Sequence, residues 1–178
     1  SESFMVDDLQ KSAFTKAVLL AQQQSDCIIM IIDWGDTDAQ EPNEFQKEWA
    51  SYLMTLGVNV IIGTRPMSVQ PYGTIRDKSG HETLVYYSLG NFIAIEEQSS
   101  RLLGGMADFI IEKNVTDGRT SISIKEKKML PLVMHYYYET ETYRSYLLSD
   151  YPADLAAKHS VSYSGQSISK DTLSYLFD

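Results

Sequence analysis

The sequence predicts a mixed α/β domain, and three patterns in it support this prediction. Residues 27–32 form a continuous apolar segment typical of a buried strand, and residues 58–62 are again strand-like. A segment with apolar residues at helical spacing separates them, and a region of β-branched residues and turn signals follows. We therefore expect a βαβ unit followed by a run of antiparallel strands.

The first half of the chain supplies the βαβ unit. Residues 6–24 have apolar side chains at helical spacing. Asp7 and Asp8 lie near the start of this segment, where carboxylates favour a helix N-terminus. The strand at 27–32 is expected to be buried on both faces. In the second helix, Pro42 suits the first turn and Gly57 suits the C-terminal end. The strand at 58–62 should then lie parallel to the first strand, after a right-handed crossover.

The second half of the chain is dominated by strand and turn signals. Asp117-Gly118 is a strong hairpin turn signal, and the residues after 140 give no clear pattern. We expect a loop at 63–71, a polar turn at 73–80, strands at 83–87, 106–112, 121–125 and 130–138, and a short closing helix at 171–177.

Composition and charge exclude several classes of protein. The 178 residues suffice for one domain, or for a large piece of one. A formal net charge of −9 repels a phosphate backbone, so nucleic acid is not an expected partner. No apolar run reaches the roughly 20 residues that a membrane-spanning helix needs. The single cysteine, Cys27, is expected to be a buried small residue. Because the chain starts at Ser1, we expect the native N-terminus to be missing.

Three loops should meet at one edge of the predicted sheet. Ligands of open α/β sheets bind outside the carboxyl ends of the parallel strands, and two loops leave such ends here. The turn at 88–91 is expected on the same edge, and Asp36 and Asp38 lie just beyond the first loop. The candidate ligand-binding residues are Asp33, Trp34, Gly35, Thr64, Arg65, Met67, Ser88 and Asn91.

Four motifs occur here in a fixed order: Asp33-Trp34-Gly35, then Pro42 and Gln46, then 63–71 (GTRPMSVQP), then Ser88-Leu89-Gly90-Asn91-Phe92. In this order and spacing the chain resembles bacterial capsule synthesis proteins of the CapA type, which are linked to poly-γ-glutamate. Their corresponding motifs are His-Trp-Gly, Pro and Gln, Gly-His-His-Pro-His-Val-Leu-Gln-Pro, and Ser-Leu-Gly-Asn-Phe. The resemblance covers residues 6–113 well and the rest loosely.

The resemblance implies a fold and a metal site, but the chain lacks the histidines of that metal site. The family is similar to calcineurin-like metallophosphatases, so the chain should form part of an αββα sandwich. In such enzymes histidines at the matching loop positions bind divalent metal. Here the positions hold Asp33, Thr64, Arg65 and Met67, of which only Asp33 could still serve as a ligand. No motif of the N-terminal half of such enzymes is found, so we expect neither a bound metal nor assignable catalytic residues.

Each candidate also has a structural interpretation. Asp33 could bond backbone donors, and Ser88 and Asn91 could shape a turn. Arg65 could bind a carboxylate or phosphate, or could be a solvated or ion-paired arginine. Trp34 is expected in the core. The three histidines His81, His135 and His159 show no ligand spacing.

Three functions remain open: an anion-binding module centred on Arg65, and two that follow from the resemblance. The first is a degenerate CapA-like domain, 1–178 as a single domain or the C-terminal half of one, that takes part in making or exporting a capsule or poly-γ-glutamate-type polymer without its own catalysis. The second is a divergent metal-dependent phosphoesterase-like hydrolase with ligands in a missing N-terminal half. Expected partners are a cell-surface polymer, its synthesis machinery, or a second copy of the chain. The expected location is the outer face of the bacterial membrane, with the anchor in a segment not present here.

Overall fold

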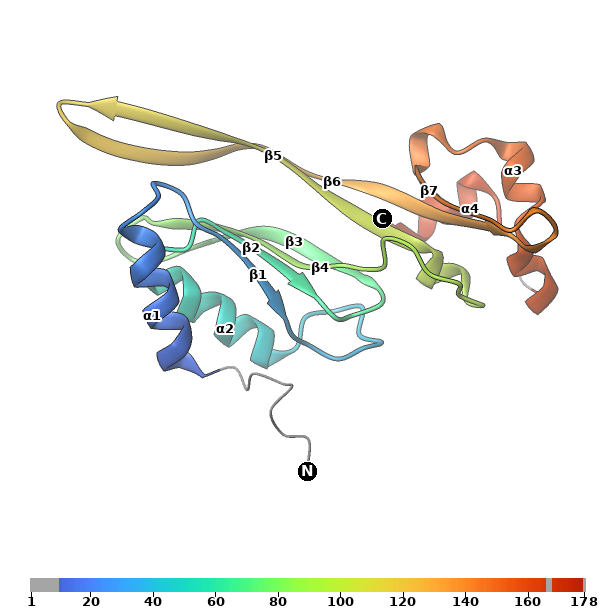
Figure 1. Ribbon diagram of the computed structural model, residues 1–178, viewed down its shortest axis with the longest axis horizontal. Coiled ribbons are helices and arrows are strands. Elements are labelled where there is room, and N and C mark those ends of the chain that lie inside the picture. Colours follow the sequence, from blue (N-terminus) through green and yellow to red (C-terminus); the bar gives the residue numbers. More distant parts are fainter. Residues whose placement is uncertain (1–9, 166–167, 178) are drawn as a thin grey trace.

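We describe the protein from a computed structural model, in which residues 10–165 and 168–177 are described. These residues form two sheets and four α-helices, whose arrangement is drawn in Figure 1. The helices and strands are α1 Lys11–Gln22, β1 Ile29–Asp33, α2 Glu44–Thr55, β2 Val60–Thr64, β3 Val69–Arg76, β4 Glu82–Leu89, β5 Leu103–Thr116, β6 Arg119–Tyr137, β7 Thr142–Leu147, α3 Ala153–Ala157 and α4 Lys170–Phe177.

The first sheet contains the predicted βαβ unit. Its strand order is β1-β2-β4-β3. Strands β1 and β2 are parallel, in a register that places Asp33 beside Thr64, and α2 connects them. This confirms the mixed α/β prediction. The expectation that all later strands are antiparallel was wrong for β4, which runs parallel to β2 and antiparallel to β3.

Helix α2 begins at Glu44, two residues after Pro42, so Pro42 precedes the N-cap and is not in the first turn as expected. Asn43 is the N-cap: its side chain accepts a hydrogen bond from the backbone of Gln46, whose side chain bonds back to the backbone of Asn43. This reciprocal capping box satisfies two amide donors that a helix start leaves free. Gly57 has a φ of +88° directly after the helix, as expected for a glycine at a helix end.

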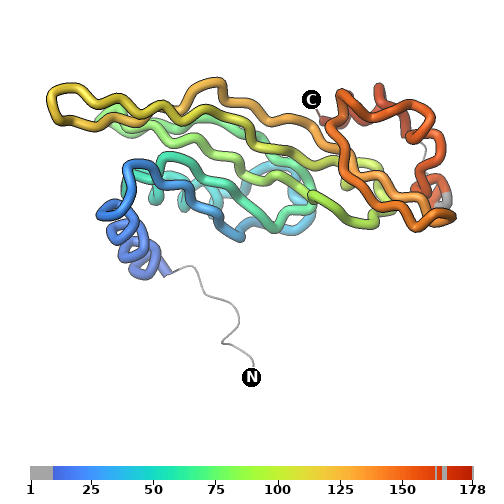
Figure 2. Tube along the Cα trace, turned by 45° about the horizontal axis from the view of Figure 1, so that its top comes forward, coloured from blue at the N-terminus to red at the C-terminus, as the bar shows by residue number. Residues whose placement is uncertain are grey.

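The chain forms three layers, in which helices, the first sheet and a long hairpin lie on top of one another (Figures 1 and 2). Helices α1 and α2 cover one face of the first sheet, with Trp34, Trp49 and Leu53 in the core between them. The β5–β6 hairpin covers the other face, where Phe109 and Ile124 pack against buried residues of β2 and β4. Such a layering is consistent with a metallophosphatase-like fold.

The second sheet extends beyond the first and carries a C-terminal module. Its order is β5-β6-β7, all antiparallel. The predicted turn at Asp117-Gly118 is confirmed. Helices α3 and α4 and the 3₁₀-helix Ser160–Ser164 pack against this end of the sheet, where Leu173 and Val161 are buried. The closing helix expected at 171–177 is α4.

Several local predictions were wrong, and exposure explains most of them. Residues 69–76, expected as the end of a loop and a polar turn, form β3, an edge strand in which residues 71–74 are exposed and Gln70 is buried. The strand expected at 130–138 is a continuation of β6. Strand β1 is not buried on both faces, because it is also an edge strand with Ile31 69% exposed. Cys27 is only partly buried. Part of the predicted helix 6–24 lies outside the described residues.

Candidate functional site

The carboxyl ends of three parallel strands meet at one edge of the first sheet. Strands β1, β2 and β4 run in the same direction, so the loops that follow Asp33, Thr64 and Leu89 leave from this edge. The eight predicted site residues lie in or next to these loops. They differ sharply in exposure: Trp34 and Ser88 are buried, whereas Asp33, Thr64 and Arg65 are exposed.

Asp33 and Arg65 form an ion pair across the first two loops. The Nε of Arg65 donates to Oδ1 of Asp33 at 2.5 Å, and a second guanidinium nitrogen contacts the same oxygen. Both side chains are about half exposed, at 59% for Asp33 and 49% for Arg65, so solvent screens the pair. An exposed pair of this kind contributes roughly 0–1 kcal/mol to stability.

The backbone of Arg65 is strained. Its φ is +95°, a conformation that a residue with a Cβ rarely adopts. Holding a non-glycine residue there costs on the order of 1–3 kcal/mol, which the surrounding structure must offset. Two residues further on, the amide of Met67 donates to the carbonyl of Thr37 at 2.7 Å and so joins this loop to the loop after β1. Thr64 lies at the end of β2 and its hydroxyl makes one long contact, 3.4 Å to the carbonyl of Ile32.

Trp34 holds the sheet edge together from inside. Its Nε1 donates to the carbonyl oxygen of Tyr87 at 2.8 Å, and its ring stacks on the Tyr87 ring at 6.0 Å between centroids. Gly63 lies against this contact, where any side chain would overlap the Tyr87 carbonyl and the Trp34 ring nitrogen. The indole of Trp34 is therefore buried with its N–H already hydrogen-bonded, and it is not available to a ligand.

A buried amide pair connects α2 with β3. Gln46 is completely buried, and its Nε2 donates to Oε1 of Gln70 at 2.8 Å. The Nε2 of Gln70 donates to the carbonyls of Ala39 and Glu41, both at 3.1 Å. Gly35, with a φ of +78°, lies directly against the Gln46 side chain. Both Gln46 and Gln70 stand in the family motifs, although neither was among the predicted site residues.

Ser88 and Asn91 shape the third loop. The hydroxyl of Ser88 donates to the carbonyl of Pro66 at 3.1 Å and accepts the amide of Gly90 at 3.0 Å. It thus joins the second and third loops. The Asn91 side chain donates to Glu96 over 3.5 Å, a weak contact within its own loop.

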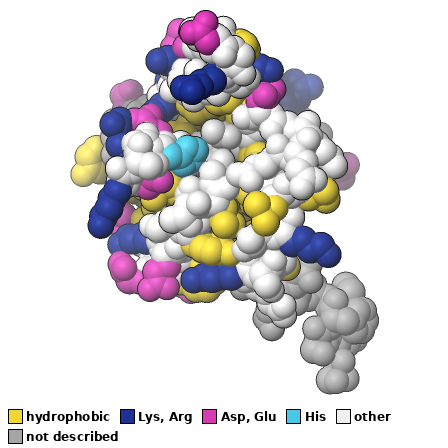
Figure 3. Space-filling view, turned by 90° about the vertical axis from the view of Figure 1, so that its left-hand side faces the viewer, with side chains coloured by type: hydrophobic (Ala, Val, Ile, Leu, Met, Phe, Trp, Pro, Cys, Tyr) yellow, Lys and Arg dark blue, Asp and Glu magenta, His cyan; other side chains and the backbone are white. Residues whose placement is uncertain are grey.

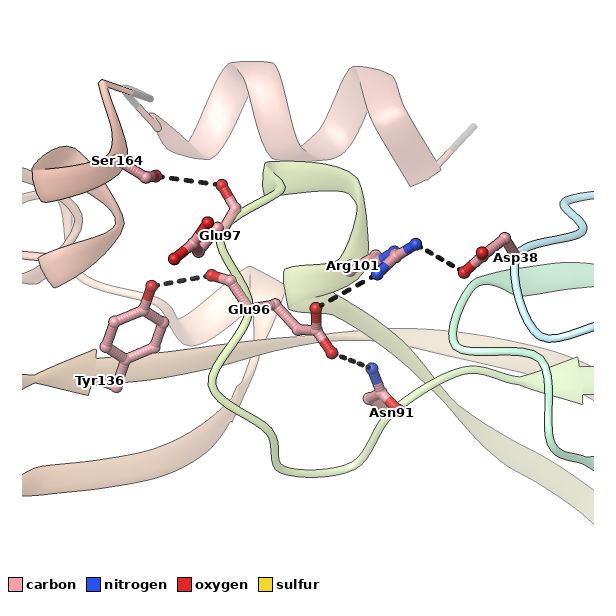
Figure 4. Close-up of polar contacts among 7 residues, drawn as sticks. All are labelled: Asp38, Asn91, Glu96, Glu97, Arg101, Tyr136 and Ser164. Carbon is pink, nitrogen blue, oxygen red and sulfur yellow. Dashed lines mark hydrogen bonds and ion pairs between the residues drawn. The ribbon is translucent and has the colours of Figure 1, made fainter.

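Figure 4 shows that Arg101 lies between two loops that are far apart in sequence. Its guanidinium contacts Asp38 at 2.5 Å and Glu96 at 3.7 Å. The same segment bonds to the second sheet, since the hydroxyl of Tyr136 donates to the Glu96 carbonyl at 2.7 Å. Sequence reasoning missed Arg101, because nothing local indicates a contact across 63 residues.

The three aspartates of the first loop each have a different partner. Asp33 is paired with Arg65, Asp38 with Arg101, and Asp36 accepts from the side chain of Asn43 at 2.8 Å. In the described ranges, 10–165 and 168–177, no three His, Cys, Asp or Glu side chains lie close enough to hold a metal ion. Asp33 is the one remaining candidate ligand, and the guanidinium of Arg65 beside it disfavours a metal cation at that carboxylate. The residues at this edge therefore do not fit a divalent metal.

Comparisons with known proteins place these motifs in a family. Residues 2–96 match the family described as bacterial capsule synthesis protein PGA_cap. The chain is also 27% identical over 122 residues to the PGA biosynthesis protein CapA of Bacillus subtilis (strain 168). That match covers 67% of this chain but 30% of the relative, so the chain corresponds to less than a third of that protein's length.

Proposed function

The chain belongs to the bacterial capsule synthesis protein family, and on that premise we propose that it is a non-catalytic binding or assembly component. It would act in making or exporting a cell-surface polymer of the poly-γ-glutamate type. Among the described residues no helix is long and apolar enough to span a membrane. We place its work at the outer cell surface, next to the machinery that synthesises the polymer.

The ion pair between Arg65 and Asp33 carries this proposal. In the family pattern these two positions hold histidines, which bind divalent metal well. Here the two side chains are a permanent cation and a carboxylate that contact each other at 2.5 Å. The pair supplies internally the positive charge that a metal would otherwise bring to Asp33, so no cation is needed to neutralise that carboxylate.

The retained motif residues support a role as a scaffold. Trp34, Gly63, Gln46 and Ser88 make contacts that hold the three loops in place, and none of these contacts needs a metal. The chain retains the residues that position the loops, although the metal-binding histidines of the family are replaced. This combination fits a protein that still presents these loops to a partner. The net charge of −9 disfavours loose contact with an acidic polymer, so the partner we favour is the synthesis machinery.

The hydrolase alternative requires a rearrangement of this site. Asp33 would have to exchange Arg65 for a metal, with the other ligands supplied from outside this chain. No contact of the described residues favours that exchange over the pair that is present.

A replacement experiment in the native host tests the proposal. The chromosomal copy would be deleted, or replaced by a double variant with Asp33→Ala and Arg65→Ala, which keeps the net charge. Surface polymer would be measured as cell-associated glutamate and sugar after acid hydrolysis. We expect the deletion to lower the polymer and the double variant to keep it, because both side chains are exposed and non-catalytic. Polymer unaffected by deletion would refute involvement. Polymer lost in the double variant, with the protein at normal abundance, would refute the non-catalytic role.

A further inference from the structure

A cleft of about 820 Å³ lies beside β3, and Glu41, Ser68 and Gln70 on its walls place it next to the loops described above. One wall is β3 itself, the second is the end of α4, and the loop at 40–41 and the start of β5 close the remaining sides. Its volume is within the range of small-molecule sites in proteins. The residues that matter for its chemistry are Gln40, Glu41, Ser68, Tyr72, Ser100 and Tyr175.

Two tyrosines give the cleft aromatic walls. The ring of Tyr72 stacks on Tyr86 at 5.1 Å and 9° between planes, which fixes one of its faces and leaves the side chain 40% exposed. Tyr86 is itself held by a 2.6 Å hydrogen bond from its hydroxyl to the carbonyl of Lys128. On the α4 wall, Tyr175 is 83% exposed, while Leu173 anchors its helix in the core. Tyr72 is thus a rigid platform, and Tyr175 is free to turn towards a ligand.

Two hydroxyls on the walls point to a polar ligand in this cleft. Ser68 is 7% exposed and lines the cavity, and its hydroxyl makes no hydrogen bond within the part of the chain that the structure describes, so it is open to the cleft. The Ser100 hydroxyl, also on the wall, makes no hydrogen bond within the same residues. A hydroxyl can both donate and accept a hydrogen bond, so a polar ligand in the cleft can bond to Ser68 and Ser100 without displacing a partner within the described residues.

Charge selects the class of ligand. Glu41 is the single charged side chain among the described residues that line the cleft, and no lysine, arginine or histidine joins it. An anion would meet a carboxylate without a compensating cation. A peptide strand added to the free edge of β3 would meet Pro71, which has no amide to donate. A neutral ring with an apolar face and several hydroxyls matches all three features of the walls.

We propose that this cleft binds a neutral oligosaccharide. The C–H face of a sugar ring would lie on Tyr72 or Tyr175, as amphipathic ligands do on aromatic side chains. Its hydroxyls would bond to Ser68, to Ser100 and to the carboxylate of Glu41, which accepts strongly. The site would give the chain contact with a neutral glycan at the cell surface, in addition to its contact with the polymer machinery.

Titration of the full chain with two neutral probes tests this inference. Chitotriose and cellotriose would be added in separate calorimetric titrations, with short poly-glutamate as the acidic comparison. The variants are Tyr175→Ala and Ser68→Ala in the cleft, and Tyr143→Ala as the matched control on β7, where that tyrosine is 42% exposed. Circular dichroism would establish that each variant is folded.

We expect at least one of the two neutral probes to bind and poly-glutamate not to bind. Tyr175→Ala should weaken binding about tenfold, and Ser68→Ala several-fold, because they remove a stacking surface and a hydrogen bond respectively. Tyr143→Ala should leave the affinity unchanged. Binding of neither neutral probe at millimolar concentration overturns the proposal, as does binding that all three variants retain. Poly-glutamate binding that Tyr175→Ala abolishes would show that the cleft takes an anion.

Discussion

At the scale of single residues, Gly63 shows what the family motifs do in this chain. It lies where the carbonyl of Tyr87 and the indole nitrogen of Trp34 meet, and a Cβ at this position would overlap both. The hydrogen bond between Trp34 and Tyr87, at 2.8 Å, joins the loop after β1 to β4. A glycine is needed here for close approach, although its backbone conformation is ordinary.

Replacement of Gly63 by alanine should therefore destabilise the protein. The added methyl group must displace the Tyr87 carbonyl or the Trp34 ring, and such overpacking costs about 1–3 kcal/mol. Gly73→Ala is the matched control, since a Cβ at that position of β3 meets nothing within 4 Å. Urea unfolding measures both changes. Equal unfolding free energies for Gly63→Ala and the wild type would contradict this expectation, because the sheet edge would then accommodate the methyl group without loss of stability.

The individual site residues could be predicted from the sequence better than their contacts. Asp33 and Arg65 were both candidates, yet no local pattern reveals either their ion pair or the φ of +95° at Arg65. Trp34 was expected in the core and is 2% exposed. The histidines showed no ligand spacing, but the fold brings the rings of His135 and His159 to 5.1 Å. Such contacts follow from tertiary packing across many residues.

At the scale of elements, the buried segments of the chain were predictable and the exposed strands were not. The apolar periodicity of α2 and the compact run of β2 follow directly from their burial. Strand β3 lies at an edge and contains Pro71 and Gly73, so its composition is that of a turn. Strand β6 runs for 19 residues past an irregularity near Glu126, where φ is +48°, and polar residues there interrupted the pattern.

The C-terminal module contains an element whose stability should depend on pH. His159 is 1% exposed, its Nε2 lies 2.9 Å from the Met134 carbonyl, and its Nδ1 accepts the amide of Val161 at 3.0 Å. A neutral ring that donates from Nε2 satisfies both contacts. Burial, assisted by the neighbouring His135, lowers the pKa of His159 from 6.5 to about 4, while the bond to Met134 opposes this shift.

The sign of the pH effect follows from this lowered pKa. Between pH 6.5 and about 4 the unfolded chain binds a proton at His159 that the folded chain does not. The stability due to the neutral histidine is thus complete above pH 6.5 and is lost as the pH falls. At most about 3 kcal/mol of unfolding free energy should disappear over this interval.

Urea unfolding as a function of pH measures this loss. His159→Gln should flatten the dependence between pH 6.5 and 4, whereas His81→Gln, at a partly buried histidine outside the module, should not. If the wild type and His159→Gln lose stability equally on acidification, the buried ring is not the titrating group.

At the scale of the whole molecule, the two sheets leave one side open. Lys127 of β6 bonds to Thr74 of β3 at 2.9 Å, and Lys113 of β5 pairs with Asp26, just before β1, at 2.6 Å. The free edges of both sheets, β1 and β5, therefore lie on the same side. Figure 3 shows hydrophobic side chains reaching the surface between charged groups in the view along the hairpin. Ile29 and Ile31 of β1 and Ile111 of β5 are among the exposed apolar residues of these edge strands.

This open side predicts self-association of the chain. Strand β1 has an apolar interior and an unpaired edge, so two copies related by a two-fold axis can pair their β1 strands antiparallel, with the two copies of Ile31 opposite each other. Ile31→Lys should abolish this pairing, because the side chain is 69% exposed in the monomer and would be buried in the dimer. Tyr143→Ala on β7, far from this edge in the sheet order, is the control. Sedimentation that shows a monomer at every concentration would exclude the dimer.

The central claim is that this member of the capsule synthesis family works without a metal at the loops after β1 and β2. Elemental analysis of the full chain, after incubation with Mn²⁺, Zn²⁺ and Mg²⁺ and removal of free ions, tests it most directly. Because Arg65 contacts Asp33 and the neighbouring aspartates have other partners, we expect no stoichiometric metal, and the same result for Asp33→Ala. One metal ion per chain that is lost in Asp33→Ala would contradict the account and restore the hydrolase alternative.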